Sequence, residues 1–125
     1  MILDSYASYL TSHSIPYSNN GFAVHFPETM VWISVSPSGM ITFSTYVGLV
    51  NFIRPAKRLI RELESKWGKY KIWPEKYSGY YEIEVEYCFP YSSIPSLHEE
   101  VVAMAQMAVD GYKIGEKIVG EEFCK

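Results

Sequence analysis

Apolar residues recur at helical spacing near the start of the chain and again in its middle. Leu3, Tyr6 and Leu10 lie on one side of an amphipathic helix predicted over residues 2–13. A second helix is predicted to begin at Pro55, because proline is tolerated in a first helical turn. Gly68 is the expected end of that helix.

A third helix is predicted close to the C-terminus. Ser96 and Glu99 have the S-x-x-E spacing of a capping box, which places the start of the helix at Ser96. Three glycines weaken its later turns, and we expect that end to kink or fray. Its predicted buried stripe comprises Leu97, Val101, Met104, Ala105, Ala108, Val109 and Tyr112.

Strict alternation of apolar and polar residues marks the strands. Residues 22–26, 30–36 and 40–47 alternate in this way and are separated by short turns, which predicts an antiparallel meander. Residues 69–73 and 81–87 alternate as well and predict a hairpin. The residues between 48 and 54 form an apolar connection whose state the pattern leaves open.

The predicted order of elements is therefore α-β-β-β-α-β-β-α. It indicates an α+β fold in which helices pack on one face of a five-stranded antiparallel sheet. The chain has no internal repeat and no linker-like stretch, so residues 1–125 are predicted to form a single domain.

Composition narrows the possible environments and partners. The net charge is −3, so no basic field is present to hold phosphate backbones, and nucleic-acid binding is not expected. Cys88 and Cys124 have no metal-type spacing and are predicted to be free thiols in a reducing compartment. We expect a cytoplasmic protein, because the chain has neither a signal-peptide pattern nor an apolar run long enough for a bilayer.

Three carboxylates stand at alternate positions of the strand that follows Gly79. Glu82, Glu84 and Glu86 would project from one strand face, and we call them the glutamate comb. Acid–base catalysis needs carboxylates that converge on one point, whereas these project in parallel. We therefore expect a solvated face, with Lys69 and Lys71 of the preceding strand opposite the comb as ion-pair partners.

The sequence contains no recognisable catalytic motif. His13, His25 and His98 come from three different predicted elements, and we expect plain structural or surface roles for them, with His98 exposed to solvent. A nucleophile elbow, an HExxH pair and a phosphate-binding loop are all missing. We predict no catalytic residue, no metal site and no cofactor.

Two surfaces are candidates for partner binding. If the strands align as predicted, Trp32, Tyr46 and His25 lie on the sheet face opposite the helices, where large aromatic groups suggest a protein partner or a homodimer contact. The alternative is that a helix or loop of the same chain covers that face. Val102 and Met107 widen the stripe of the third helix and could serve self-association.

The order of elements resembles the type III secretion chaperone-like fold and the YbjN-type family of bacterial regulators. Three stretches carry the resemblance: ASYLTSHSIPY before the meander, SKWGKYKIW at the end of the second helix, and GYYEIEVEY before the third. The resemblance covers the whole chain. It implies a small, acidic, dimeric protein that acts by holding another polypeptide, and it carries over no individual binding residue.

Three hypotheses about function follow. The first is a non-catalytic, homodimeric protein-binding module of chaperone or regulatory type. The second is a small acidic inhibitor, encoded by a mobile element, that occupies a basic site on a host protein through the glutamate comb. The third is a small enzyme or ligand-binding protein with a cleft that contains His25 or Tyr46.

Overall fold

A computed structural model describes residues 2–123 of the chain. Cys124, one of the two predicted free thiols, lies outside these residues. Cys88 is a free, exposed thiol whose sulfur lies 3.7 Å from the hydroxyl of Thr42.

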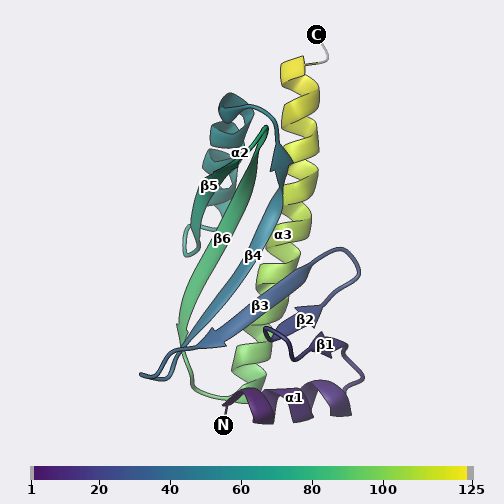
Figure 1. Ribbon diagram of the computed structural model, residues 1–125, viewed down its shortest axis with the longest axis vertical. Helices are drawn as coiled ribbons and strands as arrows, with labels where there is room; N and C mark the ends of the chain where they lie inside the picture. The colour runs from purple at the N-terminus through teal and green to yellow at the C-terminus, as the bar shows by residue number, and fades with distance from the viewer. Residues whose placement is uncertain (1, 124–125) are drawn as a thin grey trace. The chain divides into compact units, whose positions relative to one another are not determined.

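The described residues form an α+β fold with three helices and one six-stranded antiparallel sheet (Figure 1). The strand order in the sheet is β1-β2-β3-β4-β6-β5. The elements are α1 (Ile2–Ser12), β1 (Tyr17–Ser18), β2 (Ala23–His25), β3 (Met30–Val35), β4 (Met40–Val50), α2 (Ile53–Lys66), β5 (Lys71–Tyr77), β6 (Tyr80–Pro90) and α3 (Ile94–Phe123).

The predicted count of five strands is wrong, because the chain before the meander adds a short sixth strand. Tyr17 pairs with Val24 and Ser18 pairs with Ala23, so that the Asn-Asn-Gly turn at residues 19–21 closes a hairpin between β1 and β2. Strand β1 was not predicted because it has only two residues, whereas a strand is recognised from alternation over about four residues or more.

Contacts divide the chain into two compact units. The first unit comprises residues 1–45 and 87–106, and the second comprises residues 46–86 and 107–125. Strands β4 and β6 and helix α3 contribute to both units. The single domain predicted from the sequence and the placement of all helices on one sheet face stay predictions.

In the first unit, α1 packs through its aromatic side chains. Tyr6 is fully buried, and its ring lies 6.0 Å from that of Phe22 and 5.9 Å from that of His98. The core side of β4 contributes Phe43, whose ring stacks on Tyr87 of β6 at 6.2 Å. Aromatic packing therefore joins α1, the meander and the start of α3.

In the second unit, the hairpin of β5 and β6 has a two-residue turn. Tyr77 pairs with Tyr80, which leaves only Ser78 and Gly79 between the strands. Strand β5 lies at one end of the strand order and contains Pro74, a residue that an edge strand tolerates because it lacks an N–H donor. Residues 74–77, which lie beyond the strand predicted over residues 69–73, therefore belong to β5.

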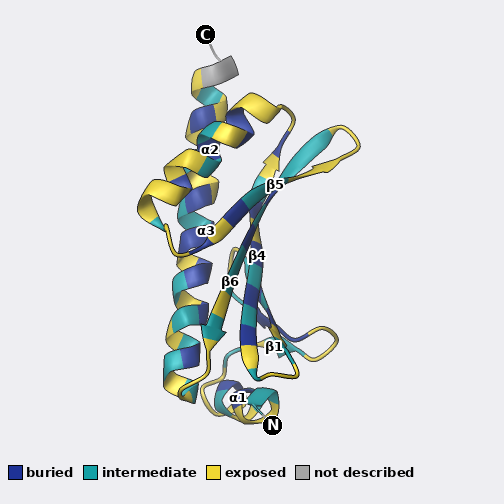
Figure 2. Cartoon of the chain, turned by 90° about the vertical axis from the view of Figure 1, so that its left-hand side faces the viewer, coloured by how far each residue is buried: buried dark blue, intermediate teal, exposed yellow. Residues whose placement is uncertain are grey.

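Helix α3 begins earlier and runs further than its sequence predicts. The Ser93 hydroxyl accepts a hydrogen bond of 3.2 Å from the Ser96 amide, so Ser93 caps the helix and the predicted cap at Ser96 is wrong. Despite its glycines, the helix is continuous over its 30 residues. Figure 2 shows buried and exposed residues recurring in alternate bands along it.

Candidate functional site: an apolar groove beside helix α3

The burial pattern of β4 changes at Gly48. Up to Val47 every odd-numbered residue from Ile41 is buried, but the next buried residue is Val50 and Leu49 is 59% exposed. Gly48 has φ = +113°, a conformation that side-chain-bearing residues rarely adopt. The backbone at Gly48 therefore turns Leu49 outward, where strict alternation would have buried it.

Two glycines let helix α3 approach the rest of the second unit closely. A Cβ atom at Gly111 would lie 2.3 Å from Cγ1 of Val47 and 3.0 Å from Cδ2 of Leu63. One at Gly115 would lie 3.3 Å from Cδ2 of Leu59. The glycines are thus contact points between α3, β4 and α2, which explains why the helix contains them.

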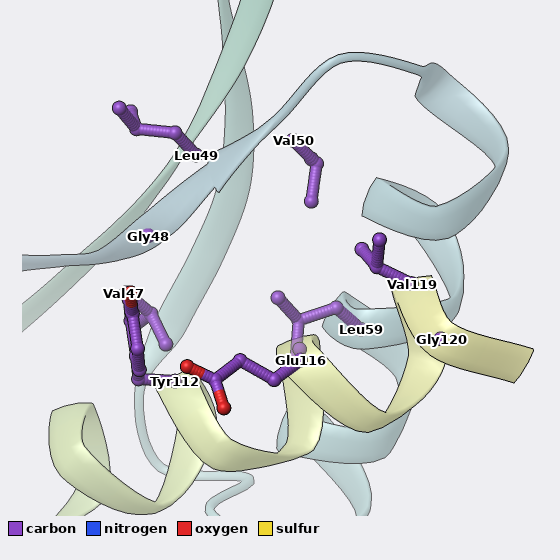
Figure 3. Close-up of a pocket in the computed structure, with 10 residues that line it drawn as sticks. Val47, Gly48, Leu49, Val50, Leu59, Tyr112, Glu116, Val119 and Gly120 are labelled. Atoms are coloured by element: carbon purple, nitrogen blue, oxygen red, sulfur yellow. The ribbon is translucent and has the colours of Figure 1, made fainter. Parts of the chain in front are cut away.

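An apolar groove lies between the last residues of β4 and the last turns of α3 (Figure 3). Its volume is about 390 Å³, within the range of small binding pockets. Three of its side chains are exposed and apolar, with exposed fractions of 59% for Leu49, 57% for Tyr112 and 37% for Val119. Its lining comprises Val47, Gly48, Leu49, Val50, Leu59, Tyr112, Gly115, Glu116, Val119 and Gly120.

The position of Tyr112 differs from its prediction. The apolar stripe of α3 placed Tyr112 on the buried side, whereas the structure exposes it. Gly111, Gly115 and Ile118 take the buried positions instead, which turns Tyr112 outward. Glycine at helical spacing was the signal for this groove, since a glycine inside a helix usually has a packing reason.

Among the described residues that line the groove, Glu116 is the only charged one. In Figure 3 its carboxylate extends from α3 across the groove toward Val47 and Tyr112. Two other acids of α3 pair with bases of α2 in the same unit: Arg58 with Glu121, and Lys66 with Asp110. Within residues 2–123, Glu116 makes no ion pair.

The glutamate comb faces fewer lysines than expected. Lys71 lies opposite Glu86, as predicted, but Trp73 lies opposite Glu84. Lys69 precedes β5 and its ammonium lies 5.4 Å from the Tyr70 ring centroid, so its predicted place opposite the comb is wrong. The two-residue turn after Tyr77 fixes this register.

A fourth carboxylate joins the comb from the neighbouring strand. Glu75 lies directly opposite Glu82. Burial raises the pKa of Glu84 to about 7, and a hydrogen bond with the Glu82 side chain and the charges of Glu82 and Glu75 act in the same direction. The Oε2 atom of Glu84 is buried and accepts no hydrogen bond from the described residues. Glu84 is therefore only partly ionised near pH 7, while Glu75 adds a further carboxylate beside the comb.

The predicted aromatic face is distributed over both units. Trp32 is half-buried on β3 in the first unit, where Ser44 lies opposite it. Tyr46 is 46% exposed and belongs to the second unit. His25 is half-buried and makes a 2.5 Å hydrogen bond with the Ser18 hydroxyl across the β1–β2 hairpin. Their joint role in partner binding stays a prediction.

The two residues predicted to widen the surface of α3 have different environments. Val102 is 43% exposed, in agreement with a surface role. Met107 is completely buried, so it cannot contribute to a surface of this chain. Methionine at helical spacing often fills a core, which is its role here.

His98 is half-buried, and its prediction as a solvent-exposed residue is wrong. Its Nδ1 atom lies 2.8 Å from the hydroxyl of Tyr6, and its ring centroid lies 5.1 Å from that of Tyr9. Burial lowers the pKa of His98, and the charge of His13 lowers it further. These contacts give His98 a structural role between α1 and α3.

Neither a metal cluster nor a membrane span is found in the described part of the chain. No group of three or more His, Cys, Asp or Glu side chains there could hold a metal ion. None of the helices over residues 2–123 is both long enough and apolar enough to cross a bilayer.

Comparison with known proteins shows a relationship of fold. No protein-family model matches the chain, and none of the curated proteins matches it. The crystal structure of YbjN from E. coli, described as a proposed transcription regulator, is similar with a TM-score of 0.58 and 12% sequence identity. The match covers 96% of this chain and 90% of YbjN. The predicted resemblance to the YbjN-type fold is thus confirmed.

Proposed function

We propose that this chain is a non-catalytic protein-binding module of regulatory or chaperone type. The groove beside α3 receives an apolar segment of a partner polypeptide. The observation that carries this proposal is the exposure of Leu49, Tyr112 and Val119 around one cavity of about 390 Å³. Clustered apolar side chains at a concave surface are characteristic of protein-recognition sites.

The form of the groove favours a polypeptide segment as its occupant. It is lined by strand and helix residues that close packing at Gly111 and Gly115 holds in place, so a partner finds a preformed surface. Its glycines leave space that an inserted apolar side chain could fill. A regulatory role would agree with the fold likeness to YbjN.

The other two hypotheses receive less support. The raised pKa of Glu84 and the position of Lys71 opposite Glu86 lower the negative charge of the comb that an acidic inhibitor would use, although Glu75 adds one carboxylate. The groove contains neither His25 nor Tyr46, which were the expected residues of a catalytic or ligand-binding cleft.

Gly120 provides a direct test of the proposed groove. A Cβ atom there meets nothing within 4 Å, and Gly120 lines the groove, so we expect the side chain of Gly120→Leu to occupy part of the groove. Gly120→Ala is the matched control, because it makes a similar change in helix propensity but leaves most of the space empty. Random dodecapeptides displayed on phage are selected on the wild-type protein and measured on both variants.

The proposal expects selected peptides that bind the wild type and Gly120→Ala but lose at least about tenfold in affinity for Gly120→Leu, since a filled groove excludes the anchoring side chain. Thermal unfolding of all three proteins controls for misfolding. Failure to select peptides, or equal binding to the three proteins, contradicts the proposal.

The homodimer predicted from the sequence is a separate proposal. Exposed Val102 supports it, because α3 presents this apolar side chain on the surface of the first unit. Light scattering of the wild type and of Val102→Asp tests it. A dimer that becomes a monomer in the variant is the expected result, whereas a monomeric wild type contradicts it.

A further inference from the structure

The groove contains a pair of residues suited to a positive charge. Tyr112 and Glu116 are separated by four positions of α3, one helical turn, and both line the groove. Residues at this spacing are neighbours on a helix surface. An exposed aromatic ring therefore lies beside an exposed carboxylate at the edge of an apolar cavity.

The Tyr112 ring has a defined support. A Cβ atom at Gly48 would lie 3.4 Å from Cδ2 of Tyr112, so the ring rests against the strand backbone where a side chain is missing. The ring itself is 57% exposed, and the electron-rich face of an exposed aromatic ring attracts a cation.

Covering the groove with a purely apolar segment would be unfavourable for Glu116. Its carboxylate has no ion-pair partner among residues 2–123, and an apolar occupant would remove its water without replacing the lost hydrogen bonds. By contrast, Asp110 and Glu121 of α3 are paired with bases of α2. The occupant must therefore bring its own positive charge to Glu116.

We propose that Tyr112 and Glu116 form a seat for an arginine side chain of the partner segment, next to the apolar residue that fills the groove. This inference rests on the proposed function. Arginine fits better than lysine, because its planar guanidinium stacks on an aromatic ring while it donates two hydrogen bonds to a carboxylate. Acidic residues beside the apolar anchor are disfavoured by repulsion from Glu116.

The test uses the peptides whose binding Gly120→Leu abolishes. We expect arginine beside the apolar anchor of these peptides. Replacing that arginine by citrulline, which keeps the shape but removes the charge, should weaken binding to the wild type about tenfold. Fluorescence anisotropy with the labelled arginine and citrulline peptides measures the ratio.

Substitutions at Glu116 and Tyr112 test whether these two residues cause the preference for arginine over citrulline. In Glu116→Gln the arginine-to-citrulline ratio should fall to about twofold or less, while the citrulline peptide binds as well as before. Tyr112→Phe keeps the ring and should keep the ratio, whereas Tyr112→Leu should reduce it. An unchanged ratio in Glu116→Gln overturns the seat.

The two proposals fail in different ways. If no peptide depends on the groove, the proposed function itself is overturned. If groove-dependent peptides contain no arginine, or tolerate citrulline without loss, only the arginine seat is overturned.

Discussion

The hydroxyl of Tyr6 lies 2.8 Å from Nδ1 of His98, and this hydrogen bond joins α1 to the beginning of α3 across 92 positions of the chain. The Tyr6 side chain is fully buried, while His98 is half-buried. Burial also raises the pKa of the Tyr6 phenol far above its ordinary value, with a smaller contribution from Tyr9. The raised pKa favours the protonated phenol, which is the form that can donate this hydrogen bond.

A double-mutant cycle measures the contribution of this bond. Tyr6→Phe should lower the free energy of unfolding by about 1 kcal/mol, the usual net value of one hydrogen bond. His98→Ala should cost more, about 2 kcal/mol, because it leaves the buried Tyr6 hydroxyl without its hydrogen-bond partner. The double variant should lose less than the sum of the two, as measured by urea denaturation. Strict additivity would show that the two groups are not coupled.

The glycines of α3 should respond to alanine in opposite directions. Gly111→Ala places a methyl group 2.3 Å from Val47 and should destabilise the protein by about 1–3 kcal/mol, as overpacking does. Gly120→Ala enters open space and should stabilise the helix by about 0.5–1 kcal/mol. Urea denaturation of the two variants gives both values. A stabilising Gly111→Ala would contradict the close packing of α3 against β4.

Glu84 should make stability depend on pH. Its pKa is raised from 4.5 to about 7 in the folded protein, so the folded state holds a proton that the unfolded state releases between these values. The contribution of Glu84 to stability is therefore fully present below pH 4.5. Stability that it provides is lost as the pH rises through this window.

Glu84→Gln isolates that contribution, because glutamine remains neutral at every pH. We expect the variant to gain stability relative to the wild type as the pH rises from 5 to 8, in urea denaturation at a series of pH values. Glu86→Gln is the matched control, since Lys71 lies opposite Glu86. If the free energies of unfolding of Glu84→Gln and the wild type change in the same way with pH, the raised pKa of Glu84 is contradicted.

Gly48→Ala should affect both stability and the groove. Alanine at φ = +113° is strained, and relief of that strain would shift the backbone on which the Tyr112 ring rests, so we expect a loss of about 1–3 kcal/mol and weaker binding of groove-dependent peptides. Gly39→Ala is the control, with φ = +86° and open space around the added methyl group. It should lose stability without loss of peptide affinity. Equal peptide affinities for both variants would exclude a role of the Gly48–Tyr112 contact.

The sequence by itself determined the class of fold and most of its elements. Alternation along residues 30–35 and 81–87 and helical spacing over residues 2–12 are local patterns, and each one follows from burial of one side of the element. These patterns suffice to predict the elements because apolar residues recur at the spacing that places them on the buried side of a helix or strand.

Only the tertiary structure decided the groove and the environment of Glu84. Tyr112 is exposed because Gly111 approaches Val47 and Leu63, which lie 64 and 48 positions away in sequence. The pKa of Glu84 is raised because burial, Glu82 and Glu75 of the neighbouring strand act together. Hydrophobic periodicity records which side of an element is buried, whereas these features depend on which residues of other elements come close, and that information appears only when the chain is folded.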